Sequence, residues 1–242
     1  MGQNNQKQET IETYRKKDNV KTFDKERHRY LYQKYKHKIE SNFLKKAIKL
    51  LKKNNIKVLD VACGTGRMLR EVFSIKKDIE YFGIDTSKEM IKQLKEKAKK
   101  LGVEKNIKIK ISDAEKMPFK DGFFDIVYSF HLLWHLEKEV QGKIIKEMSR
   151  VCKNEGIIIF DILNKNFVWE KMKRLFGKAS EDLYKLSLRE AKNIIIKDIR
   201  IEKLNDAPIK NDSLYRIFNL INKIRKILPS SFYHMLYLKV KK

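Results

Sequence analysis

The chain has 242 residues, of which 42% are apolar, and its 56 Lys and Arg residues outnumber 31 Asp and Glu residues to give a net charge of +25. This composition excludes an intrinsically disordered chain. The sequence has no run of about 18 apolar residues, so no transmembrane segment is predicted. Two cysteines are too few for a disulfide framework, and the polar N-terminus lacks the apolar core of a secretory signal, so we expect a cytoplasmic protein.

The N-terminal part of the chain changes character near residue 23. Residues 1–22 are polar and charged, which predicts a flexible arm. Over residues 23–53, apolar side chains recur at helical spacing, which predicts one long helix or two helices with a break near Ser41 and Asn42. Tyr14 and Phe23 precede the predicted domain, where they are candidates for a lid over a ligand.

Five short apolar segments predict strands in the middle of the chain, at residues 57–61, 81–84, 107–111, 123–130 and 156–162. Helical patterns separate most of them, at residues 67–73, 87–101 and 140–151, and Ser87 is the expected N-cap of the second of these helices. Strands that alternate with helices in this way predict an α/β domain with a mostly parallel sheet and helices on both faces.

The alternation of strands and helices becomes less regular after residue 164, but a single domain over residues 23–242 still accommodates the predicted elements. Residues 165–190 predict a helical insertion, in which Phe167, Trp169 and Phe176 form either core or an apolar ligand pocket. Residues 194–204 and 233–240 predict the last two strands. Residues 214–228 predict a basic amphipathic helix that docks on the sheet or, alternatively, contacts a membrane surface.

A glycine turn follows the first predicted strand. Gly64 and Gly66 join this strand to a helix, so backbone N–H groups and a positive helix end can face a ligand. Asp85 ends the second strand, where a carboxylate can accept hydrogen bonds from both hydroxyls of a ribose. A dinucleotide fold needs a third glycine where Leu69 stands, and Asp60 would repel a pyrophosphate but attract an ammonium group. These residues favour S-adenosylmethionine over NAD, although such a turn alone also fits an ordinary strand-to-helix connection.

Further candidate ligand contacts follow the third and fourth predicted strands. Asp113 can accept a hydrogen bond from an adenine amine, while a neighbouring backbone N–H serves a ring nitrogen. Phe130 and His131 stand at the exit of the fourth strand. All these features fall at the carboxyl ends of consecutive strands, which is where open α/β sheets bind ligands.

Taken together, four segments resemble the class I S-adenosylmethionine-dependent methyltransferases, in the small-molecule branch related to the ubiquinone/menaquinone biosynthesis methyltransferases. They read VLDVACGTGRML, YFGIDTSKEMI, ISDAEKMPFKDGFFDIVYSFHLLWHL and EMSRVCKNEGIIIFDI, and they lie in the family's order over roughly residues 40–162. The tail ILPSSFYHMLYLKVKK resembles the family's closing hairpin. The resemblance implies a Rossmann-like, mostly parallel sheet of seven strands, with helices on both faces and an antiparallel last strand.

The resemblance also implies S-adenosylmethionine as the methyl donor, S-adenosylhomocysteine as the product and a set of binding residues. Asp60 would help hold the methionine amino group, partly through water, and Asp85 would bind the ribose hydroxyls. The other implied contacts lie in the turn, near the adenine and at the methionine end of the pocket: Ala62, Cys63, Gly64, Gly66, Thr86, Met90, Asp113, Ala114, Phe130 and His131. Ala62 departs from the glycine of many members, a mild change because alanine is small.

Candidate catalytic groups are His131, Tyr128 and Asp161, one of which would act as a base only where the acceptor carries a proton when it attacks. Cys63 has no basic partner beside it in sequence, which favours a small filler of the turn over a nucleophile. His131 and His135 lie four residues apart, but no carboxylate or cysteine clearly completes a metal site in the sequence, so we expect no metal.

The expected function is methyl transfer to an O, N or C atom of a small or lipid-like molecule. An RNA methyltransferase of the same fold is the first alternative, because the chain is strongly basic. Only 11 of the 56 basic residues are Arg, and the lysines are spread along the chain, so a nucleic-acid partner is not favoured. A non-catalytic partner subunit is the second alternative, and the intact cofactor-binding residues argue against it. No membrane span is expected, although peripheral membrane contact stays open.

Overall fold

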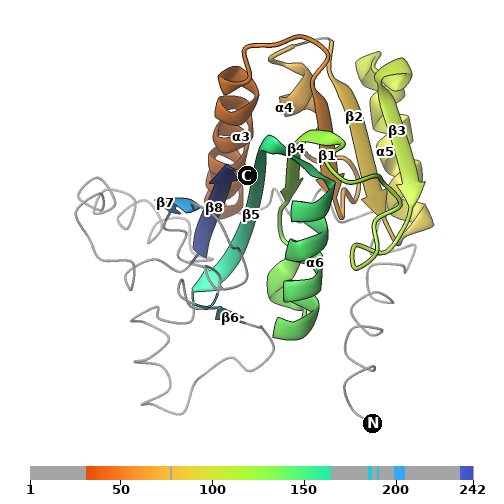
Figure 1. Ribbon diagram of the computed structural model, residues 1–242. Helices are drawn as coiled ribbons and strands as arrows, with labels where there is room; N and C mark the ends of the chain where they lie inside the picture. Colours follow the sequence, from red (N-terminus) through yellow and green to blue (C-terminus); the bar gives the residue numbers. More distant parts are fainter. Residues whose placement is uncertain are drawn as a thin grey trace.

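The computed structural model describes residues 31–76, 78–164, 185–186, 190, 199–204 and 235–241 (Figure 1). The predicted arm at residues 1–22 and the predicted helix at residues 214–228 lie outside these residues, as does most of the predicted insertion at residues 165–190. The lid candidates and the aromatic residues of the insertion also lie outside them: Tyr14, Phe23, Phe167, Trp169 and Phe176.

Four α-helices of the described part pack against a central sheet. They are α3 (Leu31–Leu50), α4 (Leu69–Phe73), α5 (Lys88–Leu101) and α6 (Lys138–Val151), with short 3-10 turns η1 (Glu104–Asn106) and η2 (Leu133–His135). Helix α3 runs without a break through Ser41 and Asn42, which decides between the two alternatives that its sequence left open. The Ser87 hydroxyl accepts the Met90 N–H at 3.3 Å and caps α5 as predicted.

Five parallel strands form the core of the sheet, in the order β3-β2-β1-β4-β5. Their bounds are β1 Lys57–Val61, β2 Glu80–Asp85, β3 Ile107–Ile111, β4 Phe124–Ser129 and β5 Cys152–Asn164. On the far side of β5, strand β8 (Met235–Lys241) runs antiparallel to β5, and β7 (Ile199–Leu204) runs antiparallel to β8. This arrangement is the Rossmann-like α/β fold that the sequence predicts.

The strand count differs from the predicted seven, because the described residues form a sheet of eight strands. The additional strand, β6 (Lys185–Leu186), pairs in parallel with Leu163 and Asn164 at the end of β5. Strand β5 extends four residues before and two residues after its predicted range of 156–162, and this extension provides the backbone edge on which β6 pairs. Residues 185–186 were predicted to be helical, and their pairing with β5 corrects that prediction.

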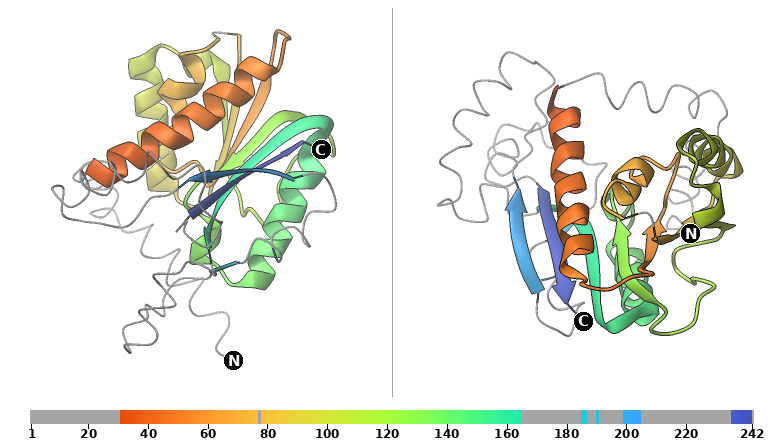
Figure 2. Two further views of the ribbon diagram at one scale, coloured as in Figure 1. Left: turned by 90° about the vertical axis from the view of Figure 1, so that its left-hand side faces the viewer. Right: turned by 90° about the horizontal axis from the view of Figure 1, so that it is seen from above.

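Helices cover both faces of the sheet, as Figure 2 shows from two directions. Side chains of successive strand residues point to opposite faces, so Val58 packs in the cluster of α3, α4 and α5, and Leu59 packs in the cluster of α6. Strands β2 and β4 flank β1. The sheet therefore extends to one side of β1 through β2 and β3 and to the other side through β4 and β5, so the strand order reverses at the carboxyl end of β1. Open α/β sheets bind ligands at such a point.

No helix of the described residues is both long enough and apolar enough to cross a membrane.

Candidate active site

The turn after β1 is a tight loop of left-handed residues. Ala62, Gly64 and Gly66 have φ angles of 59°, 52° and 71°. A Cβ atom on Gly66 would lie 2.8 Å from Cγ of Leu94 on α5, so a glycine is needed there for room as well as for conformation. A Cβ atom on Gly64 would meet no other residue within 4 Å, so the backbone of Gly64 faces open space.

Asp85 at the end of β2 is tied to this turn. Its Oδ2 atom accepts the Gly64 N–H at 2.8 Å, and its Oδ1 atom accepts the Ser87 N–H at 2.9 Å. Each carboxylate oxygen can accept more than one hydrogen bond, so these backbone contacts fix the carboxylate and leave it able to accept from a ligand. The two contacts therefore orient Asp85 toward the mouth of the turn.

Asp60 near the end of β1 is buried between two tyrosines. Its Oδ2 atom accepts hydrogen bonds of 2.7 Å from both the Tyr81 and the Tyr128 hydroxyls. No described residue donates a hydrogen bond to its Oδ1 atom. Burial raises the pKa of Asp60 to about 7, although both tyrosine hydrogen bonds and the charge of Arg67 act in the opposite direction. A ligand cation near Oδ1 would favour the ionised form.

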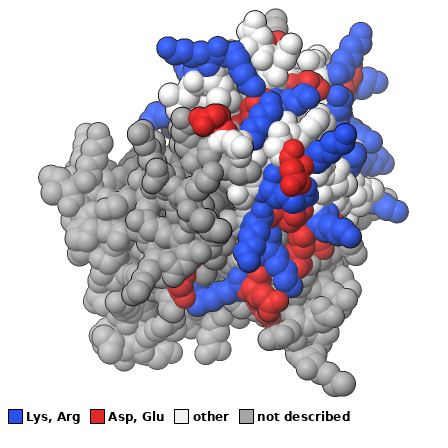
Figure 3. All heavy atoms as spheres, in the orientation of Figure 1, with Lys and Arg blue, Asp and Glu red and all other residues white. Residues whose placement is uncertain are grey.

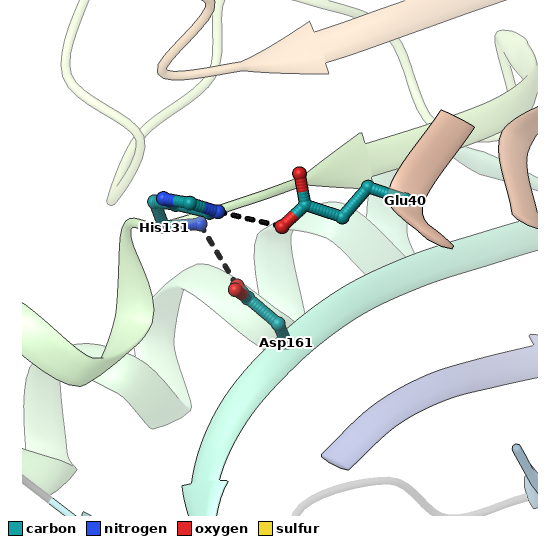
Figure 4. Close-up of side chains that lie close together, drawn as sticks. All are labelled: Glu40, His131 and Asp161. Atoms are coloured by element: carbon teal, nitrogen blue, oxygen red, sulfur yellow. Dashed lines mark hydrogen bonds and ion pairs between the residues drawn. The ribbon is translucent and has the colours of Figure 1, made fainter. Parts of the chain in front are cut away.

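His131 stands at the exit of β4 and is held by two acidic residues, as Figure 4 shows. Its φ angle is 65°, and its backbone N–H donates to Oδ1 of Asp161 at 2.9 Å. Its ring atom Nε2 lies 2.6 Å from Oε1 of Glu40, on α3. The second Glu40 oxygen, Oε2, lies 2.5 Å from Nη1 of Arg67. The helix α3, the turn after β1 and the exit of β4 thus meet at one buried carboxylate.

Asp161 on β5 lies behind His131 rather than in the wall of the cavity described below. It is fully buried, and its Oδ2 atom has no hydrogen-bond partner among the described residues. Burial raises the pKa of Asp161 to about 6, while the charge of Lys36 opposes that rise.

The structure brings two carboxylates to His131, which the sequence did not indicate. Ligand atoms of Glu40, His131 and Asp161 lie within 4.8 Å of one another, close enough to surround a metal ion. Arg67 is paired with Glu40, and the charge of Lys36 acts on both Glu40 and Asp161. Two cations therefore already act on these carboxylates, and a bound metal ion would have to compete with them.

A cavity opens at the carboxyl ends of β1, β2 and β4. Predicted site residues contribute ten members of its lining: Asp60, Ala62, Cys63, Gly64, Asp85, Thr86, Met90, Tyr128, Phe130 and His131. Six more residues line it that were not predicted to contact a ligand: Thr65, Arg67, Met68, Leu132, His135 and Leu136. Gly66 is not in the lining, because its role is to let the turn approach α5.

Two of the predicted adenine contacts, Asp113 and Ala114, lie in an adjoining hollow, whereas Met90 lines the main cavity and Thr86 lines both. Asp113 and Ala114 line the adjoining hollow together with residues that also line the main cavity, namely Ala62, Asp85, Thr86, Leu132 and Leu136. The Oδ1 atom of Asp113 accepts the Glu115 N–H at 2.9 Å, which fixes the side chain at the start of the loop after β3. The two hollows are thus continuous along the ends of β1, β2 and β3.

Cys63 packs in the core beside the turn. It is buried, and its Sγ atom lies 2.9 Å from where a Cβ atom on Gly83 would stand. Burial, together with the charges of Asp60 and Asp85, raises the pKa of the Cys63 thiol well above its usual value. These contacts support the interpretation of Cys63 as a small filler rather than a nucleophile.

Glu40 is a candidate site residue that sequence reasoning missed. It lies 91 residues before its partner His131, so no local motif joins the two. A signal was nevertheless present on α3, where Lys36 and Glu40 stand one turn apart and Leu44 follows one turn later on the same face. Both charged residues are buried, at 8% and 0% exposure, in a helix whose buried face is otherwise largely apolar. Charged residues on such a face need partners.

Comparisons with known proteins show which family this chain resembles. A family model described as a methyltransferase domain matches residues 59–160, which run from β1 to β5. Ajmaline N-methyltransferase of Rauvolfia serpentina is 38% identical over 102 residues, which are 42% of this chain and 34% of that protein. The matched segment thus spans only about a third of that relative's length.

Two further similarities extend over most of the chain. An uncharacterised protein of Methanocaldococcus jannaschii is 32% identical over 173 residues, covering 70% of this chain and 72% of that protein. A solved structure of magnesium protoporphyrin IX methyltransferase from Synechocystis PCC 6803, with S-adenosylhomocysteine bound, has the same fold. Its TM-score is 0.68 at 14% identity, over 96% of this chain and 98% of that one.

Proposed function

The chain belongs to the class I S-adenosylmethionine-dependent methyltransferases, and from this premise we propose that it transfers a methyl group to a small or lipid-like molecule. The observation that carries the proposal is the continuity of one cavity. Its wall joins the cofactor-type turn around Gly64 and Asp85 to His131 at the exit of β4. A methyl donor and an acceptor can therefore lie side by side in it.

The residues of the turn fit the donor. Gly64 presents bare backbone to open space, and the fixed carboxylate of Asp85 can accept from ribose hydroxyls. Asp60 has an oxygen that no described residue occupies, which suits the methionine ammonium group directly or through water. Asp113 and Ala114 extend the site toward the adenine. When bound, S-adenosylmethionine supplies a methyl group already activated by its sulfonium.

On the acceptor side, the chain's own residues align the acceptor, exclude water and accept a proton where one must leave. Of the three candidate bases, His131 and Tyr128 line the cavity, and the contacts of Tyr128 favour His131 for this task. The Tyr128 hydroxyl donates to Asp60, and burial raises the Tyr128 pKa well above its usual value. Asp161 is fully buried behind His131 and binds the His131 backbone.

A small-molecule acceptor is supported over RNA. The relative ajmaline N-methyltransferase is named for a small molecule, an alkaloid. On the face drawn in Figure 3, basic side chains alternate with acidic ones rather than forming one continuous patch. On α6, basic and acidic side chains form ion pairs such as Lys143 with Glu139 and Arg150 with Glu147. Surfaces that bind nucleic acid typically gather Lys and Arg on one face or along one helix.

A transfer assay with methyl-labelled S-adenosylmethionine tests the proposal. The purified chain is incubated with four acceptor sets: phenols and quinols, fatty acids and phospholipids, small amines, and total RNA. We expect label in one of the first three sets, and we expect a His131→Ala variant to lose it even at a saturating concentration of S-adenosylmethionine. Label in RNA alone would replace the proposal with the RNA alternative. Absence of transfer to all sets, together with intact cofactor binding, would favour a non-catalytic partner.

A further inference from the structure

Glu40 carries a full negative charge inside the protein. Although complete burial alone would raise its pKa, Arg67, His131 and Lys36 together hold that pKa well below the usual value. Arg67 belongs to the turn after β1, and Lys36 lies one turn before Glu40 on α3. Near neutral pH, Glu40 is therefore ionised and can only accept hydrogen bonds.

The two oxygens of Glu40 have different partners, and this difference fixes the ring of His131. Oε2 faces Nη1 of Arg67, a group that can only donate. Oε1 faces Nε2 of His131 at 2.6 Å, so Nε2 must carry a hydrogen that it donates to Glu40. The neutral ring then has its basic lone pair on Nδ1, which Figure 4 shows on the side away from Glu40.

The backbone of His131 is anchored independently of its ring. The Asp161 carboxylate accepts the His131 N–H at 2.9 Å and holds the residue at a φ angle of 65°. A left-handed conformation at a non-glycine residue persists only where the surroundings determine it. Main-chain and side-chain contacts together therefore leave the imidazole a single orientation at the cavity wall.

We propose that Glu40 is a positioning residue that holds His131 with Nε2 as a donor and thereby makes Nδ1 the atom that takes a proton from the methyl acceptor. The inference rests on the proposed methyl transfer. In that step the proton leaves the acceptor's O or N atom for Nδ1, and the methyl group takes its place on that atom as its bond to the sulfonium sulfur breaks. S-adenosylhomocysteine is the neutral leaving group, and the imidazolium later returns the proton to water. Glu40 stabilises the imidazolium, as does Asp161 through its negative charge when ionised, while Lys36 and Arg67 oppose it.

Glu40→Gln is the discriminating variant because Arg67 constrains the amide. Arg67 only donates, so the amide oxygen of Gln turns to Arg67 and its NH2 group turns to His131. Nε2 must then accept, and the hydrogen of the neutral ring moves to Nδ1. The matched control is Glu71→Gln. Glu71 on α4 is likewise tied to α3, through Lys45 and Ser41, but does not contact His131.

The experiment is 15N NMR of histidine-labelled protein at pH 8, with the His131 signal assigned from a His131→Asn variant. We expect the Nε2–H form in wild type and in Glu71→Gln, and the Nδ1–H form in Glu40→Gln. With an acceptor from the transfer assay, kcat of Glu40→Gln should fall at least about tenfold while the dissociation constant of S-adenosylhomocysteine changes less than about twofold.

The tautomer is read without an acceptor, so the two proposals can fail separately. A wild-type ring with hydrogen on Nδ1 would overturn the inference even if Glu40→Gln did not fold. An unchanged kcat in Glu40→Gln with a reversed tautomer would overturn it too. Failure of the wild-type protein to bind S-adenosylhomocysteine would instead overturn the proposed function.

Discussion

Asp60 and Tyr128 are 68 residues apart in sequence, and the Tyr128 hydroxyl donates a 2.7 Å hydrogen bond to the Asp60 carboxylate. The Tyr81 hydroxyl donates to the same oxygen, so strands β1, β2 and β4 are joined at one buried acid. Both donors are neutral, and burial raises the pKa of Asp60 to about 7. Near neutral pH, Asp60 therefore changes between a protonated and an ionised form at the cavity wall.

This pKa predicts that cofactor binding depends on pH. The ammonium group of S-adenosylhomocysteine binds the ionised carboxylate better, so binding releases the proton of Asp60. For a group of pKa about 7, the ionised fraction rises about tenfold from pH 6 to pH 8, and the affinity should rise with it. Calorimetry at three pH values measures this. Asp60→Asn should bind more weakly with a flat profile, and an equally flat wild-type profile would contradict the role of Asp60.

Asp85 gives a second prediction. In Asp85→Ala, the Gly64 and Ser87 N–H groups lose their acceptor, and the ribose hydroxyls lose theirs. Hydrogen bonds to a charged group are each worth about 1.5–3 kcal/mol, so losing even one of them should lower the affinity for S-adenosylhomocysteine by at least about tenfold. The control is Asp121→Ala, which removes an exposed acid outside both hollows. If the two variants bind equally well, the ribose assignment is wrong.

Two glycines of the turn should separate stability from binding. Gly66→Ala adds both left-handed strain and a 2.8 Å contact with Leu94, and should lower the free energy of unfolding by about 2–4 kcal/mol. Gly64→Ala adds only the left-handed strain and should lower the free energy of unfolding by about 1 kcal/mol. It also places a methyl group in the space proposed for the ligand. Urea unfolding and calorimetry measure the two effects. Equal loss of stability in both variants would contradict the packing argument.

Asp125 at the start of β4 predicts an acid-sensitive contribution to stability. It accepts from Lys153 at 2.7 Å and from the Lys57 N–H at 2.9 Å, and it also pairs with Lys53. Although burial alone would raise its pKa, Lys153, Lys53 and the Lys57 N–H together hold that pKa below its usual value. This stabilisation is present above the unfolded-state pKa of about 4 and is lost as pH falls through the lower folded-state value.

Asp125→Asn should therefore lower the free energy of unfolding by about 1–3 kcal/mol at pH 7, and the difference from wild type should shrink toward pH 3. Chemical unfolding at both pH values measures this, with the exposed Asp121→Asn as the matched control. A difference that persists unchanged at pH 3 would show that the carboxylate charge is not its source.

The sequence predicts the core of the fold because its signals are local. Alternating and continuous apolar runs mark the five parallel strands, and Ser87 marks the start of α5. The sequence could not predict strand β6, because two residues are too few to show a periodicity. This strand is defined only by its pairing with the end of β5.

The candidate site likewise contains residues that local motifs predict and a residue that only tertiary contacts bring in. Asp60, Gly64 and Asp85 lie in contiguous motifs, so their convergence on one cavity follows from the order of the strands. Glu40 reaches the site from a helix that no motif marks, and its role depends on tertiary contacts with Arg67 and His131. Only the burial of a charged residue on a helix face pointed to it.

The central claim is that the cavity at the ends of β1, β2 and β4 binds S-adenosylmethionine. Calorimetric titration of the wild-type chain with S-adenosylhomocysteine tests it most directly. We predict one site per chain with a dissociation constant in the micromolar range. A folded protein, verified by circular dichroism in the same buffer, that releases no binding heat and shows no thermal stabilisation by either S-adenosylhomocysteine or S-adenosylmethionine would contradict it.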